Sequence, residues 1–234
     1  MVNSTTTSYR DNSLTASTTY YYGVEATETS YVSTMSAIVS ATTMALPNTP
    51  KGLALNATSA VKMSLTWTDT VPPQGLPIGS YQVYCGLAPG SLTKVATVLN
   101  APYNYSGLTA GTTYYCAVLA ADTGGDLSAM SAPVSASTYA LPVAPTSVVA
   151  TANSTTKVTV TWTETVPSNG LPIGSYQIYR GSSPSSLSLV ATRATASYTD
   201  TTVSALATYY YAILATDTSN EASPMSANTE VVVP

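Results

Sequence analysis

Leu108-Thr-Ala-Gly-Thr-Thr-Tyr-Tyr-Cys-Ala-Val-Leu-Ala120 is a segment that recurs, in related form, at Leu14 to Ala26 and at Val203 to Ala215. Each copy starts with turn-forming residues and continues with the period-two alternation of a β-strand, so that Tyr114 and Tyr115 fall on opposite faces. The copies are about 95 residues apart, which is too long for a solenoid repeat and suits a whole small domain. The chain is therefore expected to repeat a complete β domain.

Two further landmarks have the same spacing. Trp67 and Trp162 each stand near the end of an alternating strand, and each is followed by a nearly identical block, Gly75-Leu-Pro-Ile-Gly-Ser-Tyr-Gln-Val-Tyr84 and Gly170-Leu-Pro-Ile-Gly-Ser-Tyr-Gln-Ile-Tyr179. This order of motifs, closed by Leu-x5-Tyr, resembles the fibronectin type III domain. The resemblance implies a tyrosine corner, in which a ring near the start of a late strand bonds back to upstream backbone. The implied core landmarks are Trp67, Trp162, Tyr20, Tyr114 and Tyr209.

The predicted fold is all-β, with tandem immunoglobulin-like sandwiches of the fibronectin type III kind arranged in a rod. Residues 47–141 and 142–234 each match a complete domain, whereas residues 1–46 match only the C-terminal half of one. Paired prolines in the segments 45–50 and 140–145 favour extended, semi-rigid linkers. The half-domain would leave apolar strand faces uncovered, so we expect another piece of chain to complete it. Either upstream residues of a longer array or a neighbouring molecule could supply that piece.

The composition argues against several classes of function. Charged residues make up 8% of the chain, where about 25% is usual, while Ser and Thr together reach roughly 30%. The net charge of −4 comes without a basic cluster, so nucleic acid is not an expected partner. No apolar run approaches the ~18–20 residues of a membrane span, so membrane insertion is not expected.

The chain has no histidine, which removes the commonest general base and the Ser-His-Asp and Cys-His nucleophile systems. We expect no enzyme activity, no catalytic residue and no cofactor. Four carboxylates end strands that should meet at one pole of each sandwich, where a glycosidase pair or a calcium site is conceivable. Because calcium takes six to eight oxygen ligands, solvated rim charges are the favoured interpretation, and these residues are only weak calcium candidates: Asp69, Asp122, Glu164 and Asp217.

Cys85 and Cys116 fall on strands that pair in the resembled family, and both share the parity of core residues. A disulfide is the favoured interpretation, with two buried free thiols as the alternative. The second domain has Arg180 and Tyr211 at the corresponding positions, so the fold itself does not depend on this bond.

Two kinds of surface feature could contact other molecules. Four N-glycosylation sequons begin at Asn3, Asn56, Asn104 and Asn153, two of them in the turn expected after the first strand of each domain, namely those at Asn56 and Asn153. With so few charges over so much hydroxylated surface, we predict a glycan coat, although sequons also arise by chance in such a chain. Outward tyrosines could stack on sugars, pack against another chain, or serve only as good strand formers; these are Tyr84, Tyr115, Tyr179 and Tyr210.

The sequence therefore favours a non-enzymatic extracellular structural protein, a repeat segment of a glycosylated cell-surface stalk or fibre. Its expected partners are other copies or segments of the same array, and glycans. The alternative is a spacer or carbohydrate-binding accessory module of a larger secreted polysaccharide-degrading enzyme. Neighbouring sequence discriminates between the two, since a catalytic domain would support the module and further repeats or an anchor would support the stalk.

Overall fold

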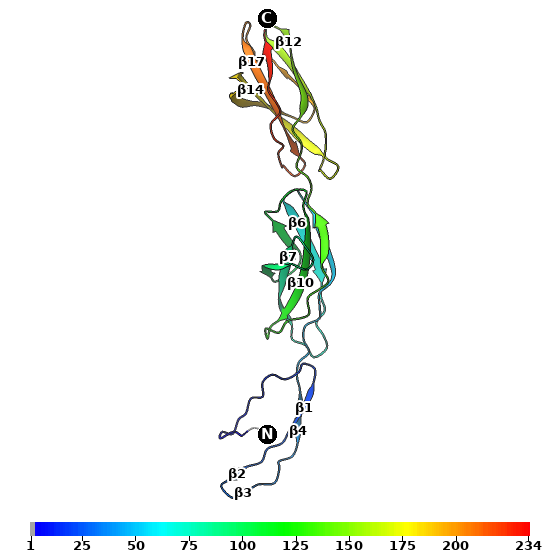
Figure 1. Cartoon of the computed structure of the whole chain (residues 1–234), viewed down its shortest axis with the longest axis vertical. Helices are drawn as coiled ribbons and strands as arrows, with labels where there is room; N and C mark the ends of the chain where they lie inside the picture. The colour runs from blue at the N-terminus through cyan, green and yellow to red at the C-terminus, as the bar shows by residue number, and fades with distance from the viewer. Residues whose placement is uncertain (1–2) are drawn as a thin grey trace. The chain divides into compact units, whose positions relative to one another are not determined.

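The computed structural model describes residues 3–234, and all their regular elements are β-strands, as the fold prediction requires (Figure 1). Within these residues there is no helix with the length and apolarity of a membrane crossing. The N-terminal segment contains β1 (Thr19–Tyr22), β2 (Thr27–Glu28), β3 (Tyr31–Val32) and β4 (Val39–Thr42). β1 pairs antiparallel with β4, and β2 with β3.

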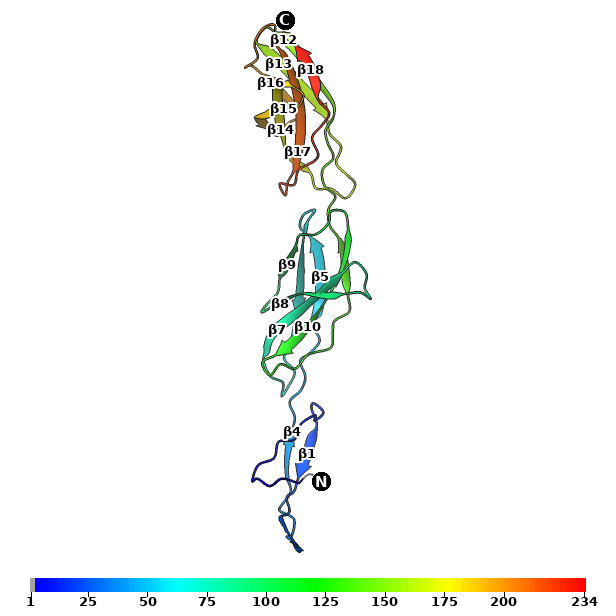
Figure 2. The same cartoon turned by 60° about the vertical axis from the view of Figure 1, so that its left-hand side comes forward.

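Strands of the next part form two sheets (Figure 2). In chain order they are β5 (Lys51–Ala57), β6 (Lys62–Thr68), β7 (Ile78–Gly86), β8 (Thr93–Val98), β9 (Tyr103–Ser106), β10 (Thr113–Asp122) and β11 (Val134–Ser137). One sheet has the order β5-β6-β9 and the other β11-β10-β7-β8. We call this the first sandwich.

The remaining strands repeat the topology and form the second sandwich. They are β12 (Thr146–Ser154), β13 (Lys157–Thr163), β14 (Ile173–Ser183), β15 (Ser186–Arg193), β16 (Ser197–Asp200), β17 (Thr208–Asp217) and β18 (Thr229–Val232). The sheets are ordered β12-β13-β16 and β15-β14-β17-β18. Equal strand order in both copies is what the 95-residue repeat predicts.

Alternation along β6 and β13 builds the core. In β13, Val158, Val160 and Trp162 are buried while the threonines and lysine between them face outward. The Trp162 ring meets Tyr176 edge-on, with centroids 5.1 Å apart, in a cluster that also contains Ile178. Each large apolar side chain buried in this way contributes roughly 1.5–3 kcal/mol. The threonines that alternate with the core residues give the sheet its hydroxylated outer face.

In the segments that follow β10 and β17, serine side chains accept hydrogen bonds from backbone N–H groups of those two strands. The N–H groups of Val118 and Ala120 donate to Ser131 Oγ and Ser128 Oγ, each over 2.9 Å, and the serine N–H groups return bonds to the same two residues. The motif Ser-x-Met-Ser-Ala carries this pattern three times, starting at Ser33, Ser128 and Ser223. We call these bonds the serine staples. They account structurally for part of the unusual hydroxyl content.

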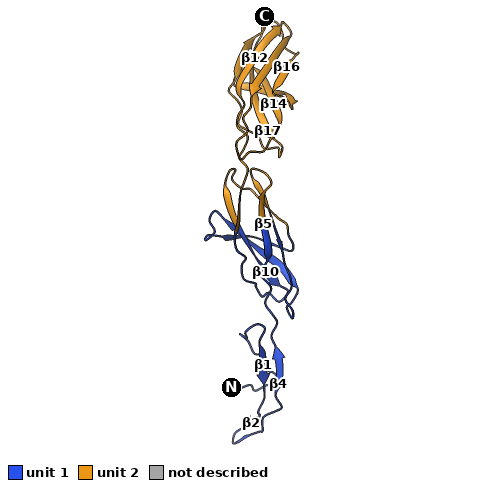
Figure 3. Ribbon diagram, turned by 90° about the vertical axis from the view of Figure 1, so that its right-hand side faces the viewer, with its two compact units in different colours: residues 1–53, 66–101, 116–133 blue, residues 54–65, 102–115, 134–234 orange. Residues whose placement is uncertain are grey.

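The chain divides into two compact units, residues 1–53, 66–101 and 116–133 in one and residues 54–65, 102–115 and 134–234 in the other (Figure 3). The division runs through strands β5, β6 and β10. The domain boundaries expected after residues 46 and 141 are not tested by it and stay a prediction.

Candidate functional site

Three tyrosine hydroxyls bond back to upstream backbone. The N–H groups of Thr15, Thr109 and Ser204 donate to the hydroxyls of tyrosines five residues downstream, over 2.9, 3.0 and 3.2 Å. The acceptors are the expected landmarks Tyr20, Tyr114 and Tyr209. Tyr114, like Trp67 and Trp162, is buried, whereas Tyr20 and Tyr209 are half-buried. Each copy of the repeat therefore contains a tyrosine corner, even where Val203 replaces the leucine.

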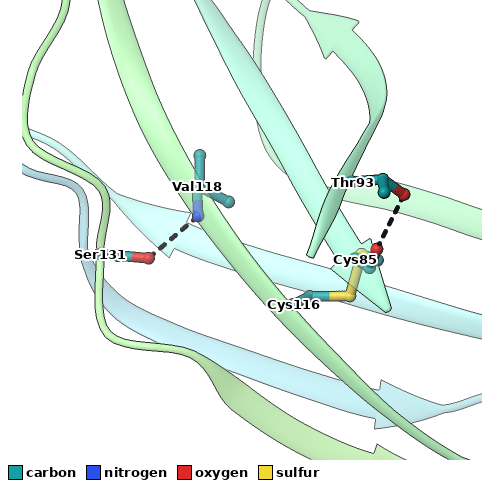
Figure 4. The surroundings of a disulfide bond; sticks show 5 residues. All are labelled: Cys85, Thr93, Cys116, Val118 and Ser131. Atoms are coloured by element: carbon teal, nitrogen blue, oxygen red, sulfur yellow. Dashed lines mark hydrogen bonds between the residues drawn. A yellow bond between two sulfur atoms is a disulfide. The ribbon is translucent and has the colours of Figure 1, made fainter. Parts of the chain in front are cut away.

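Cys85 on β7 and Cys116 on β10 form a disulfide (Figure 4). Both residues are almost fully buried. Close by, the Thr93 hydroxyl donates to the Cys85 carbonyl over 3.4 Å, and the Ser131 staple bonds to Val118 two residues after Cys116. The bond therefore clamps the two strands inside the sandwich.

The second sandwich has a polar cluster where the first has the disulfide. Arg180 and Tyr211 both reach Asp200, with Arg180 Nη1 2.6 Å and the Tyr211 hydroxyl 2.9 Å from Oδ2. Asp200 Oδ1 accepts from the N–H and the hydroxyl of Thr202. The Arg180 guanidinium also lies over the Tyr209 ring, 5.0 Å from its centre. We call Arg180, Asp200 and Tyr211 the ionic clamp.

The clamp is electrostatically self-consistent. Burial by itself would raise the pKa of Asp200, but hydrogen bonds from Thr202, Tyr211 and Arg180 outweigh it, and the pKa is lowered. Burial, and then the bond to the Asp200 carboxylate, raise the pKa of Tyr211. Asp200 is therefore ionised and Tyr211 protonated around neutral pH, as their hydrogen bonds require.

Three of the four candidate carboxylates accept hydrogen bonds from nearby backbone N–H groups. Oδ1 of Asp122 accepts the N–H groups of Gly124 and Asp126, and Asp217 caps the equivalent turn in the second sandwich. Asp69 accepts from Thr70 N–H, while Glu164 directly follows β13 and is half-exposed. Within residues 3–234 no three acidic, cysteine or histidine side chains are grouped as metal ligands. What the structure supports for Asp122 and Asp217 is turn formation.

The expected outward tyrosines are all partly exposed. Tyr84 and Tyr179 donate to the glutamine two residues earlier on the same strand, Gln82 and Gln177, over 3.0 and 2.8 Å. Glu230, opposite Tyr210 on β18, raises the pKa of that tyrosine. Tyr115 is half-buried on β10. These contacts show a repeated Tyr-Gln pair and leave a role in ligand binding as a prediction.

All four sequon asparagines are exposed. The expected turn position is wrong for two of them, because Asn56 lies within β5 and Asn153 within β12. Pairing with the neighbouring strand continues almost to the turn, which begins only at Thr58 in the first sandwich. Glycosylation itself stays a prediction.

Two hollows on the surface of residues 3–234 are small. The one lined by Thr49, Lys51, Thr68, Asp69 and Thr70 has a volume of about 40 Å³, which suits water better than a sugar unit. A more open one of about 200 Å³ lies along Glu28 to Tyr31 of a single hairpin. Ligand pockets usually enclose roughly 300–1,000 Å³.

Sequence reasoning missed two features of this site. The ionic clamp was signalled by Arg180 and Tyr211 standing together at the two cysteine positions, but its third member, Asp200, corresponds to Tyr105 in the first sandwich. The serine staples were signalled by the threefold Ser-x-Met-Ser-Ala motif.

A three-stranded sheet facing a four-stranded one, repeated twice and accompanied by tyrosine corners, is the arrangement of tandem fibronectin type III domains. The chain therefore has the all-β sandwich fold that its motifs predicted.

No family model matches the chain. It is 35% identical over 239 residues to exoglucanase B of Cellulomonas fimi, covering 95% of this chain and 21% of that protein. It is 31% identical over 192 residues to chitinase A1 of Niallia circulans, covering 77% of this chain and 25% of that protein. The chain thus spans about a fifth to a quarter of the length of these relatives.

Among solved structures, the chain is similar to the chicken CNTN1 FN1–FN3 domains. The TM-score is 0.42 and the sequence identity 19%, over 94% of this chain and 79% of that one.

Proposed function

We propose that this chain is a non-catalytic spacer module of a larger extracellular enzyme that degrades a polysaccharide. The observation that carries the proposal is the pattern of coverage. Nearly the whole chain aligns with exoglucanase B, yet it accounts for only 21% of that protein, and a chitinase matches over a similar share. A segment shared by enzymes named for different polysaccharides has a role apart from the choice of substrate.

The chain's own chemistry supports this proposal. It has no histidine, and its buried carboxylates Asp122, Asp200 and Asp217 are engaged by turns or by the ionic clamp. A buried disulfide is typical of proteins in oxidising compartments, which fits an extracellular location. The stalk or fibre that the sequence alone favoured is the second candidate. It rests on the repeat and the composition of the sequence, and the comparisons favour the spacer.

Determining the complete polypeptide in its native source tests the proposal. Extraction, tryptic mapping and sequencing of the coding region on both sides of this segment should reveal a glycoside-hydrolysing domain in the same chain. A continuous array of further repeats ending in a surface anchor would contradict the spacer and support the stalk. The purified segment itself should release no reducing sugar from cellulose or chitin.

Intact mass of the native protein also tests the predicted glycan coat. We expect a mass above that of the polypeptide, which falls after deglycosylation. A mass equal to that of the unmodified polypeptide would contradict the predicted glycan coat and would leave the spacer role untouched.

A further inference from the structure

Two turns far apart in the sequence meet around the Glu221 carboxylate. Ser59 Oγ donates to Oε1 over 2.6 Å, and the Ala60 N–H donates to Oε2 over 2.7 Å. Ser59 and Ala60 form the turn between β5 and β6, while Glu221 follows β17. Both turns belong to the same compact unit, shown in orange in Figure 3.

The receiving turn is built to hold a carboxylate. Ser59 and Ala60 are only 4% and 0% exposed, and Ser59 Oγ is oriented because it accepts from the Val61 N–H over 3.1 Å. A hydroxyl and an N–H therefore point at the two oxygens of one carboxylate. Hydrogen bonds to an ionised acceptor are roughly twice as strong as neutral ones.

The donating turn does not need the Glu221 side chain for itself. Its shape is set by Asp217, whose Oδ1 accepts the N–H groups of Ser219 and Glu221, and by the backbone bond from Asp217 N–H to the Glu221 carbonyl. The Glu221 carboxylate is thus available for a contact outside its own turn. Ser219 adds a bond from its hydroxyl to the Thr58 carbonyl over 3.4 Å.

A second attachment lies in the linker after β11. The Ala140 N–H donates to the Asn169 carbonyl over 2.7 Å, and Asn169 Nδ2 donates to the Thr138 carbonyl over 3.0 Å. The same linker contact recurs where Ala45 N–H donates to the Gln74 carbonyl. The linker contact is therefore a property of the repeat, and the carboxylate contact adds a second point of attachment.

We propose that Glu221 and the turn at residues 58–61 form an inter-repeat joint, in which a turn of one sandwich binds a carboxylate of the following sandwich. Together with the linker contact, the joint limits rotation about residues 138–142. The partner surface for such a carboxylate is another sandwich of the same repeat. This proposal does not depend on the spacer function, because a stalk would use the same joint.

The test measures motion across the joint in the full chain. Spin labels are attached to cysteines introduced at two exposed positions, through N104C and T195C, while the native disulfide is kept oxidised. Double electron–electron resonance then measures the distance between the label on the first sandwich and the label on the second. Glu221→Ala and Ser59→Ala should each broaden the distance distribution. Asp126→Ala is the matched control, because Asp126 occupies the position equivalent to Glu221 in the first sandwich and is exposed; it should leave the distribution unchanged.

Stability measurements separate loosening from misfolding. Since its side chain takes no part in its own turn, Glu221→Ala should keep the urea midpoint reported by Trp162 fluorescence. A distribution for Glu221→Ala and Ser59→Ala that superimposes on the parent would overturn the joint. Broadening of equal size in the Asp126→Ala control would overturn it as well.

Discussion

In the second sandwich, a single carboxylate oxygen of Asp200 binds side chains from two other strands. Its side chain is fully buried, and Oδ2 accepts from both Arg180 and Tyr211. Replacing one partner of a buried ion pair leaves the other charge uncompensated. We expect Asp200→Asn to lower the free energy of unfolding of the second sandwich by about 3 kcal/mol. Urea unfolding followed through Trp162, in a Trp67→Phe background, measures it.

Exposed Asp126→Asn is the control for that substitution and should change little. The pH dependence adds a sharper readout. Because the folded-state pKa of Asp200 is lowered, its contribution is present above the ordinary carboxyl pKa of about 3.9 and is lost as the pH falls through the lower folded-state value. Asp200→Asn should therefore flatten the acid limb of stability. An acid limb as steep as the parent's would argue against the clamp.

Cys85 and Cys116 perform the corresponding task in the first sandwich. The bond closes a loop across a sequence separation of 31 residues, which the loop-entropy account values at about 3–4 kcal/mol. Reduction should lower the unfolding midpoint reported by Trp67 in a Trp162→Phe background. The midpoint reported by Trp162 in the converse background should stay constant, and equal losses in both would show that the effect is not confined to this bond.

Leu206 is in a backbone conformation that suits glycine. Its φ is 60°, and Gly111 has the same φ at the equivalent position of the first sandwich. A Cβ in this left-handed region costs roughly 1–2 kcal/mol, and Leu206 is 88% exposed, so its side chain gives little back. Leu206→Gly should raise the stability of the second sandwich by about 1 kcal/mol in thermal unfolding. Leu206→Ala keeps the Cβ, and a gain there as large as for glycine would refute the strain.

At the scale of strands, the serine staples join a strand to the segment that follows it, and a serine hydroxyl takes the place of a backbone carbonyl as the acceptor. The Ile213 N–H on β17 donates to Ser226 Oγ over 2.9 Å in a buried position. Ser226→Ala leaves that donor unsatisfied, which costs about 1–3 kcal/mol. Hydrogen exchange should show loss of protection at the Ile213 amide, whereas exposed Ser204→Ala should not. Unaltered exchange at Ile213 would mean that another acceptor serves this amide.

The fold and the core landmarks could be predicted because short local motifs carry the resemblance to the fibronectin type III domain. Alternation around Trp67 and Trp162 and the Leu-x5-Tyr spacing each depend on a few neighbouring residues. The ionic clamp depends on β14, β16 and β17 meeting inside the sandwich, which no local pattern specifies. The end of β5 could not be predicted for a similar reason. Asn56 was expected in a turn but lies within β5, because pairing with the neighbouring strand determines where a strand ends.

For the molecule as a whole, the N-terminal segment is the least self-sufficient part. Its strands are short, and Tyr21, Val24 and Val39 are between 64% and 72% exposed. Isolated two-stranded ribbons are marginal in water. Residues 1–46 alone should give a disordered or aggregated sample by circular dichroism, while residues 47–234 should melt cooperatively. A monomeric, cooperative melt of the short peptide would show that it needs no completing strands.

The two clamps differ in chemistry although they occupy the same place in the repeat. A reductant attacks Cys85–Cys116 and has nothing to act on at Arg180, Asp200 and Tyr211, whereas strong acid neutralises Asp200 and leaves the sulfur bond intact. The two sandwiches therefore have the same architecture, but different chemical conditions break their clamps. No single change in redox state or acidity removes both clamps at once.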